Sequence, residues 1–147
     1  MLVAKCALTD TRPAPDKIGL QVRELSPTMV LIIVSGEIDA SIETSLLDGI
    51  VTNLRRHRQL VLDLSRVRFF GTAGYSTLHR LHSHCARTAV DWVLIGGSEV
   101  HRLMRLCDPD GIFPTADNIV SAVAALARGP HRTPLLKTQL LRSVPTN

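Results

Sequence analysis

The stretch that decides the fold is residues 59–82, QLVLDLSRVRFFGTAGYSTLHRLH. Its first part, LVLDL, is an apolar run of the kind found in strands that are buried on both faces. A short apolar step, VRFF, leads to a turn of small residues, GTAG, and then to apolar residues at helical spacing. A strand that passes at once into a helix predicts an α/β unit, with Thr72 at the start of the helix.

Thr72 is the candidate functional residue of this stretch. The first N–H groups of a helix lack intrahelical partners, and the helix dipole favours negative charge there. A phosphate ester on the Thr72 hydroxyl would therefore be well tolerated at this place. The alternative is structural: Thr72 is an N-cap, whose hydroxyl accepts a backbone hydrogen bond.

The residues before this stretch predict two strands and a helix. Residues 18–25 alternate loosely and predict an edge strand, and residues 29–36, MVLIIVSG, predict a buried strand. Asp39 is placed to N-cap the next helix, and Glu43 adds favourable charge to its first turn. One apolar stripe is expected to face inward, formed by Leu46, Leu47, Ile50, Val51 and Leu54.

This helix is predicted to end in a basic run, Arg55-Arg56-His57-Arg58. Cations at a helix C-terminus are stabilised by the helix dipole, which is the main interpretation of the run. A phosphate-binding patch is the alternative.

After Thr72 the pattern continues to alternate between helix and strand. A helix is expected over residues 73–89, a third buried strand over 91–97 (DWVLIGG), and a helix capped by Ser98. The inward residues of the two helices are expected to be Leu78, Leu81, Cys85 and Ala89, then Val100, Leu103, Met104 and Cys107.

The last predicted elements are a turn, a strand and a helix. Residues 108–111, DPDG, have the composition of a turn, and residues 112–114 predict a short edge strand that the proline limits. Asp117 is expected to cap the final helix. That helix is expected to bury Val120, Val123, Leu126 and Ala127 and to end at Gly129.

The alternation predicts an α/β fold with a small mixed β-sheet of about four to five strands, covered mainly by about four α-helices. A length of 147 residues suits one domain with tails. We therefore expect a flexible lead at 1–17, one domain at 18–128 and a basic tail at 129–147.

Charge and composition argue against several functional classes. The net charge is +4, but the last 18 residues carry three of these charges, so the pI is a weak sign of nucleic acid binding. Aromatic residues make up 3% of the chain and offer few platforms for stacked bases. No apolar run approaches the roughly 20 residues of a membrane span, and the start does not read as a secretory signal. We expect a cytoplasmic protein with no direct nucleic acid or membrane contact.

Two clusters of reactive side chains have plainer interpretations. Cys85 and Cys107 fit apolar helix faces as buried hydrophobes, and a redox pair between them is the sharper alternative. His79, His82 and Cys85 share a helix face and His84 does not, but no further ligand pair completes a zinc site. We expect no metal and no cofactor.

An enzyme is the first rival function. Thr72, His79 and Asp63 could be arranged as a nucleophile, a base and an orienting acid. No G-x-S-x-G elbow or oxyanion motif accompanies them, so we expect no catalytic residue and no enzymatic activity.

Four motifs, in order along the chain, resemble those of the STAS domain of bacterial anti-sigma factor antagonists. They are Gly36-Glu37-Ile38-Asp39, the strand LVLDLS with VRFF, the turn Gly71-Thr72-Ala73-Gly74, and LIG with VHRL and GIF over residues 94–113. The resemblance covers roughly residues 18–128 and implies the STAS fold.

The resemblance also implies partner switching. An antagonist of this family binds an anti-sigma factor, usually a GHKL-type serine/threonine kinase, and so frees a sigma factor. The kinase phosphorylates the turn hydroxyl, which corresponds to Thr72, and a PP2C-type phosphatase reverses this. The implied partner surface contains Gly36, Glu37, Asp39, Gly71, Thr72, Ala73, Gly74 and Tyr75.

The turn departs from the family pattern at three positions. Gly71 replaces an aspartate, Thr72 replaces a serine as the acceptor, and Ala73 replaces a second hydroxyl residue. A glycine at 71 also permits a positive φ. The alternatives are an unphosphorylated scaffold subunit of a signalling assembly and a module that binds a nucleotide or small ligand at this turn. A homodimer also stays open.

Overall fold

The computed structural model describes residues 18–128, which form one five-stranded sheet in the order β2-β3-β4-β5-β6. The strands are β2 (Gly19–Glu24), β3 (Met29–Ile38), β4 (Gln59–Phe70), β5 (Asp91–Gly96) and β6 (Thr115–Ala116). β2 is antiparallel to β3, and every other neighbouring pair is parallel. The sheet is therefore mixed, with β2 as an antiparallel edge, as the sequence predicts.

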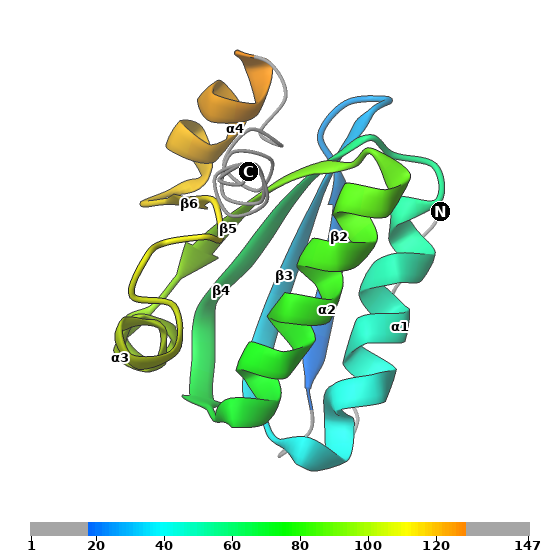
Figure 1. Ribbon diagram of the computed structural model, residues 1–147. Helices are drawn as coiled ribbons and strands as arrows, with labels where there is room; N and C mark the ends of the chain where they lie inside the picture. The colour runs from blue at the N-terminus through cyan, green and yellow to red at the C-terminus, as the bar shows by residue number, and fades with distance from the viewer. Residues whose placement is uncertain (1–17, 129–147) are drawn as a thin grey trace, which may run out of the picture.

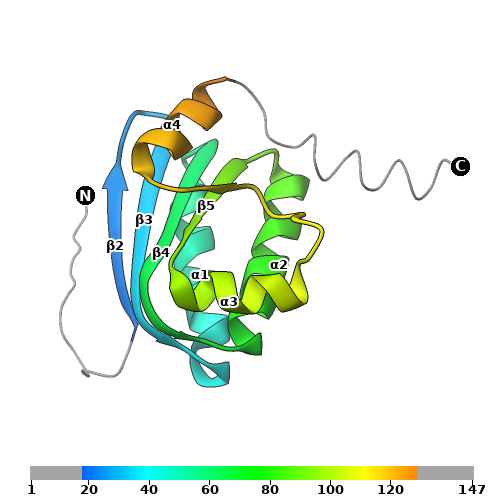
Figure 2. The same ribbon diagram turned by 90° about the vertical axis from the view of Figure 1, so that its left-hand side faces the viewer.

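The helices cover both faces of this sheet. They are the 3-10 turn η2 (Ala40–Ile42), α1 (Glu43–Leu54), α2 (Thr72–Thr88), α3 (Ser98–Cys107) and α4 (Ile119–Ala127). Figure 1 shows α1 and α2 side by side across one face, and Figure 2 shows α4 on the opposite side of the strands. The predicted α/β class is confirmed.

Two apolar clusters explain the uninterrupted hydrophobic runs of β3 and β4. Alternate residues such as Ile32 and Leu62 point toward α1 and α2, where they are fully buried. Their neighbours, such as Leu31 and Val61, point the other way and pack with Leu126 of α4. A parallel strand covered on both faces has no solvent side, so polar alternation disappears.

β4 is longer than the predicted strand and positions the Thr72 turn. Its pairing with β5 ends at Leu64, while its pairing with β3 continues to Phe70. The last six residues of β4 therefore reach past β5 and deliver Gly71 and Thr72 to the end of the sheet (Figure 1).

The predicted strand at 112–114 is wrong: β6 follows it, at Thr115–Ala116. Pro114 has no N–H for a ladder, and only its carbonyl is used, as acceptor for Leu94 N–H at 2.8 Å. Phe113 before it is buried in the larger core cluster. This segment is therefore apolar because Phe113 packs in the core, and not because the segment pairs as a strand.

The cap and inward face of α4 also differ from the prediction. Asn118, not Asp117, caps the helix, and its Oδ1 accepts from Ser121 N at 2.8 Å. Ala122 and Leu126 are buried, whereas Val120 is 79% exposed and Ala127 is exposed. With two neighbouring polar caps and a nearly uniform apolar helix, the sequence could not fix which face turns inward.

Three further helix predictions need adjustment. Asp39 caps η2 by accepting from Ser41 N at 2.9 Å, and α1 begins only after that turn. Gly97, not Ser98, occupies the N-cap position of α3. Ala89 is the exposed left-handed C-cap of α2 and not part of its buried stripe.

The buried stripes of α1 and α3 contain fewer residues than the sequence predicts. Leu46, Ile50 and Leu54 of α1 are buried, at the i, i+4, i+8 spacing of one helix face. Half-buried positions flank the stripes: Leu47, Val51, Leu103, Met104 and Cys107.

None of the helices within residues 18–128 combines the length and the apolar character that a membrane crossing requires.

Candidate functional site

Thr72 is the first residue of α2 and lies on the surface. Gly71 occupies the N-cap position in an extended conformation, and no side chain caps the helix. The Thr72 side chain is exposed, and its hydroxyl has no hydrogen bond to any residue from 18 to 128. The alternative that Thr72 is the N-cap is therefore wrong, because the cap is one residue earlier.

The segment at 36–39 lies beside this turn. Glu37 is opposite Phe69 and Ile38 is opposite Phe70 in the β3–β4 ladder. The Gly71 N–H then donates to the Ile38 carbonyl at 3.4 Å. The two motifs that the sequence singled out, GEID and GTAG, thus form one continuous surface at the end of the sheet.

Gly36 bends β3 at this surface. Its φ is +105°, a region that residues with a Cβ rarely adopt, and the register of β3 against β4 shifts between Gly36 and Glu37. The bulge leaves Gly36 buried and the next side chain, Glu37, exposed.

Phe69 belongs to this surface, although sequence reasoning placed it only in an apolar step. Its side chain is 49% exposed, an unusual fraction for an aromatic residue at the end of a central strand. A Cβ on Gly71 would lie 3.2 Å from the Phe69 ring. The φ of Gly71 is −95°, so this glycine serves the close approach of Phe69 and not a positive φ.

Ala73 and Gly74 hold the turn in place from below. The Ala73 carbonyl accepts a hydrogen bond from Thr77 Oγ1 at 2.9 Å. Gly74 is buried, and a Cβ there would collide with the Phe70 ring. These two residues therefore position the surface, while Thr72 and Phe69 present side chains on it.

Tyr75 and Glu43 connect the turn to the rest of the fold. The half-buried Tyr75 ring lies 5.8 Å from the Phe113 ring and 6.2 Å from the His79 ring, centroid to centroid. Glu43 at the start of α1 accepts from Ser76 Oγ at 2.6 Å and pairs with Arg80 at 3.5 Å. The first two turns of α2 are thus fixed against α1.

The histidines of α2 pack or face solvent. His82 Nδ1 accepts from Trp92 Nε1–H at 3.1 Å, and its Nε2 is buried without a hydrogen-bond partner among residues 18–128. Burial lowers the pKa of His82, His79 lowers it further, and Asp108 opposes both. In the part of the chain that the structure describes, no three His, Cys, Asp or Glu side chains are grouped to hold a metal.

Cys85 and Cys107, for which a redox pair was the alternative interpretation, are two free thiols in this structure. Cys85 is buried in the core, and this burial, with a smaller contribution from Asp91, raises the pKa of its thiol to about 12. Cys107 is half-buried on α3. The thiol of Cys85 therefore resists the deprotonation that disulfide exchange requires.

The hypothetical triad does not assemble as a chain of hydrogen bonds. Asp63 is buried in β4, and its Oδ1 accepts from Ser65 N at 2.9 Å. The His79 ring is tilted at 47° to the Tyr75 ring, and the Thr72 hydroxyl has no hydrogen-bond partner among the described residues. Thr72, His79 and Asp63 are therefore not linked by hydrogen bonds in the described part of the chain.

Comparisons with known proteins agree with this geometry. Residues 20–122 match the family model of the STAS domain. The chain belongs to the STAS domain family. The anti-sigma factor antagonists among its relatives are typically not enzymes.

Two of the similar proteins are mycobacterial. The chain is 32% identical to osmosensory protein A of Mycobacterium tuberculosis over 130 residues, which cover 83% of this chain and 82% of that protein. A crystal structure of an anti-sigma factor antagonist from Mycobacterium paratuberculosis is 27% identical, with a TM-score of 0.67. The match covers 76% of this STAS chain and 96% of the other.

The unphosphorylated form of the anti-sigma factor antagonist SpoIIAA is more distant. It is 17% identical, with a TM-score of 0.61 over 76% of this chain and 97% of that one. This likeness establishes the fold alone and assigns no residue a role.

Proposed function

We propose that this STAS domain is an anti-sigma factor antagonist, and that Thr72 is the residue whose phosphorylation switches it off. The unmodified protein would bind an anti-sigma factor of the GHKL kinase type and so release a sigma factor. A PP2C-type phosphatase would restore binding. The proposal relies on similarity to an antagonist over 76% of the chain and on the surface around Thr72.

The observation that carries the proposal is the exposed Thr72 hydroxyl at the start of α2, beside the segment 36–39. A kinase can reach this hydroxyl without unfolding the turn. The free N–H groups and the dipole at the start of the helix accommodate the product phosphate within the folded protein.

The half-exposed Phe69 ring suits a docking surface. Aromatic side chains are enriched among the residues that dominate protein interfaces, because they bury a large area at a low cost in side-chain entropy. Phe69 follows two exposed arginines on β4, Arg66 and Arg68, for which no ion pair is recorded in residues 18–128. We therefore expect an apolar pocket with an acidic rim on the partner.

A phosphate on Thr72 would oppose this contact. It adds about −1.5 to −2 charges at pH 7 next to the apolar anchor, so docking would require its desolvation. Glu37, Asp39 and Glu43 already place carboxylates along the neighbouring segment. A coupling of about 3 kcal/mol corresponds to roughly a hundredfold change in affinity.

The test starts with affinity capture on the unmodified protein from native cytoplasm, with and without phosphatase treatment, and identification of the captured partner. Binding of the purified partner to Thr72→Ala and Thr72→Glu is then compared. We expect Thr72→Ala to bind as wild type and Thr72→Glu to bind at least about tenfold more weakly. Thr52→Glu, at an exposed position of α1, is the matched control.

Two results would change the proposal. Equal binding of Thr72→Ala and Thr72→Glu would remove the switch and favour an unphosphorylated scaffold subunit, which the Gly71 and Ala73 substitutions in the turn make the main competitor. Capture without any anti-sigma factor would remove the antagonist role.

A further inference from the structure

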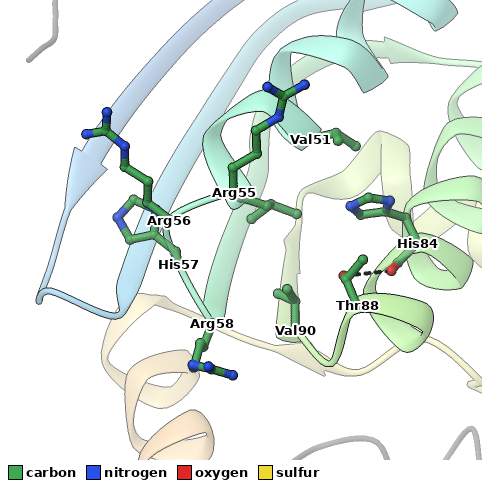
Figure 3. A pocket seen from close by; sticks show the side chains of 9 residues that line it. Val51, Arg55, Arg56, His57, Arg58, His84, Thr88 and Val90 are labelled. Atoms are coloured by element: carbon green, nitrogen blue, oxygen red, sulfur yellow. Dashed lines mark hydrogen bonds between the residues drawn. The ribbon is translucent and has the colours of Figure 1, made fainter.

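A pocket of about 590 Å³ lies at the C-terminal ends of α1 and α2, the opposite end of these helices from Thr72 (Figures 1 and 3). Its apolar lining comes from Val51, Leu54 and Val90. The other lining residues are polar or basic: Arg55, Arg56, His57, Arg58, His84 and Thr88. None of the described residues that line the pocket carries a carboxylate.

Three of the lining residues are arginines that form no ion pair with any residue from 18 to 128. Arg80 and Arg102 have ion-pair partners, but no ion pair within the described chain involves Arg55, Arg56 or Arg58. Each helix C-terminus contributes only about half a negative charge. The two helix ends therefore offset about one of the three positive charges, so capping alone does not account for the basic run.

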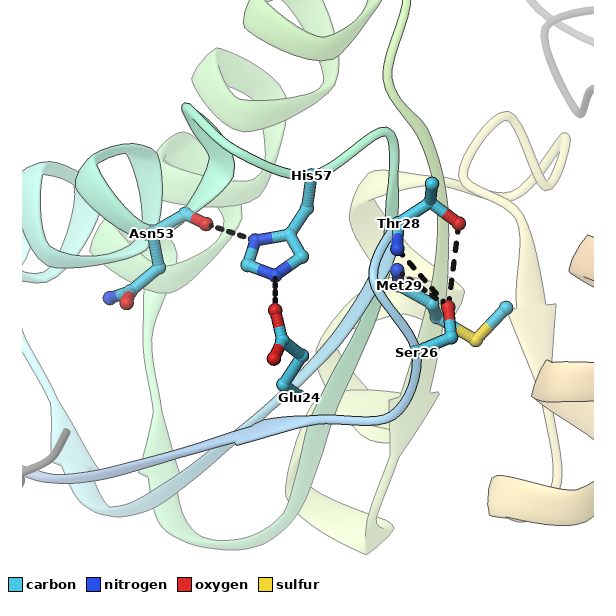
Figure 4. Close-up of polar contacts among 6 residues, drawn as sticks. All are labelled: Glu24, Ser26, Thr28, Met29, Asn53 and His57. Carbon is cyan, nitrogen blue, oxygen red and sulfur yellow. Dashed lines mark hydrogen bonds and ion pairs between the residues drawn. The ribbon is translucent and has the colours of Figure 1, made fainter. Parts of the chain in front are cut away.

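His57 anchors the loop that presents these arginines. Its Nδ1 lies 2.9 Å from the Asn53 carbonyl and its Nε2 lies 3.1 Å from Glu24 Oε2 (Figure 4). Both partners accept, so both hydrogen bonds exist together only when the ring carries two protons. The ring thus ties the end of α1 to β2 and is not free for a ligand.

The backbone of the same loop is fixed on its other side. Arg58 N and Gln59 N both donate to the Thr28 carbonyl, at 2.9 and 3.0 Å. A loop held at both sides presents its side chains from a defined position, which lowers the ordering cost of binding.

Arg55 and His84 stand on opposite sides of the hollow in Figure 3, whereas Arg56 extends away from it. The Thr88 hydroxyl donates to the His84 carbonyl at 2.8 Å, and the partly buried His84 ring has no hydrogen bond to residues 18–128. The ring nitrogens and the Arg55 guanidinium are therefore free to bind a group that enters between them.

We propose that this pocket binds a small organic phosphate. The phosphate oxygens would contact Arg55 and His84, and the apolar part of the ligand would cover Val51 and Val90. Guanidinium groups bind phosphate through paired N–H donors, and the volume falls within the range of small-molecule sites. The site is separate from Thr72 and does not depend on the antagonist role.

The test is an NMR titration of the full chain with 1-naphthyl phosphate, alongside inorganic phosphate and 1-naphthol. We expect saturable shifts at the backbone amides of Val51, His84 and Val90. Inorganic phosphate, which lacks the apolar part, should bind at least about tenfold more weakly, and so should the uncharged 1-naphthol. Added salt should weaken naphthyl phosphate binding.

Two variants and a control test whether 1-naphthyl phosphate binding depends on the pocket residues or only on the positive charge of the protein. Arg55→Gln and His84→Gln should each weaken 1-naphthyl phosphate binding at least about tenfold, and Arg105→Gln, at an exposed position of α3, should not. Thermal melts verify that each variant folds. If one of the two pocket variants does not fold, the other alone tests the proposal.

Unchanged affinity in a folded pocket variant would overturn the proposal. It would also fail if 1-naphthol bound as well as the phosphate, or if the shifts mapped to the Thr72 end. Because no partner protein takes part, these results are independent of the antagonist experiments.

Discussion

The two ends of α2 differ in the charged side chains that surround them. At the start, Thr72 lies beside a segment that carries Glu37, Asp39 and Glu43, and the exposed Phe69 ring is its apolar neighbour. At the end, arginines without an ion pair among residues 18–128 line a pocket with an apolar floor. A phosphate added at the first end is expected to repel a partner, whereas the second end is proposed to bind a phosphate. Under these two proposals, one helix separates a site for a covalent signal from a site for a dissociable ligand.

The substitution with the largest expected effect should unfold the domain and so abolish the sites at both ends of α2. Leu62 is fully buried between the sheet and the α1–α2 layer. A carboxylate at Leu62→Asp has no partner there and should cost several kcal/mol, comparable with the total stability of a domain. We expect no cooperative thermal melt by circular dichroism. Arg66→Asp, at an exposed position of the same strand, should melt as wild type; a normal melt of Leu62→Asp would show that β4 is not central.

A second change damages only the Thr72 end. The Cβ of Gly74→Ala would overlap the Phe70 ring, and such overpacking typically costs about 1–3 kcal/mol. We expect a lower denaturant midpoint and weaker partner binding. The control is Gly49→Ala on α1, where a Leu20 methyl group at 3.3 Å is the one close neighbour among the described residues. That change should be neutral or stabilise by up to about 1 kcal/mol.

Phe69→Ala asks whether the exposed ring anchors the partner. Truncation of a central aromatic residue at an interface typically costs about 2 kcal/mol or more, or roughly a thirtyfold loss of affinity. Stability should change little because the ring is already half exposed. Val120→Ala, at a residue that is 79% exposed on α4, should not alter binding. If Phe69→Ala and Val120→Ala bind the partner with equal affinity, Phe69 is not part of the partner-binding surface.

His82, in the middle of α2, predicts a pH dependence that belongs to neither end. Its pKa is lowered in the folded protein, so the unfolded chain binds more protons. Stability should be complete above about pH 6.5, the ordinary histidine pKa, and should fall as the pH decreases from there toward the lowered folded pKa. His82→Gln keeps an acceptor for Trp92 and should flatten this dependence, measured by urea unfolding at several pH values. His79→Gln should weaken this dependence only in part, because burial lowers the pKa of His82 more than His79 does.

The smallest expected effect concerns the separation of the two ends. Arg55→Gln should change partner affinity by less than about twofold, because distant sites without shared contacts behave independently. Isothermal titration calorimetry with the captured anti-sigma factor measures this. A tenfold loss would mean that the partner also covers the basic pocket.

The sequence predicted the fold well where one strong pattern was present. The apolar runs of β3 and β4 and the stripe of Leu46, Ile50 and Leu54 come from a buried layer, so their periodicity carries the information. The prediction failed at Pro114 and Asp117, where short elements with several candidate breakers or caps are resolved only by tertiary contacts.

The candidate site was predicted in part for the same reason. The adjacency of the segment 36–39 and the Gly71 turn follows from a parallel β3–β4 pair, in which Gly71 N–H reaches the Ile38 carbonyl, and was implied by the family resemblance. The exposure of Phe69 could not be predicted, because the pattern VRFF indicates one uniform apolar segment. The ring is exposed because β4 extends past β5. The basic run was seen, but its pocket depends on His84, 26 residues later on α2.

The most direct test of the central claim compares one protein with and without its phosphate. The captured anti-sigma factor and Mg-ATP are used to phosphorylate the chain, mass spectrometry counts the added phosphate, and the two purified forms are titrated with fresh anti-sigma factor. We predict one phosphate, on Thr72, and at least about tenfold weaker binding of the modified form. Equal binding of the two forms, or a phosphate on another residue, would contradict the account.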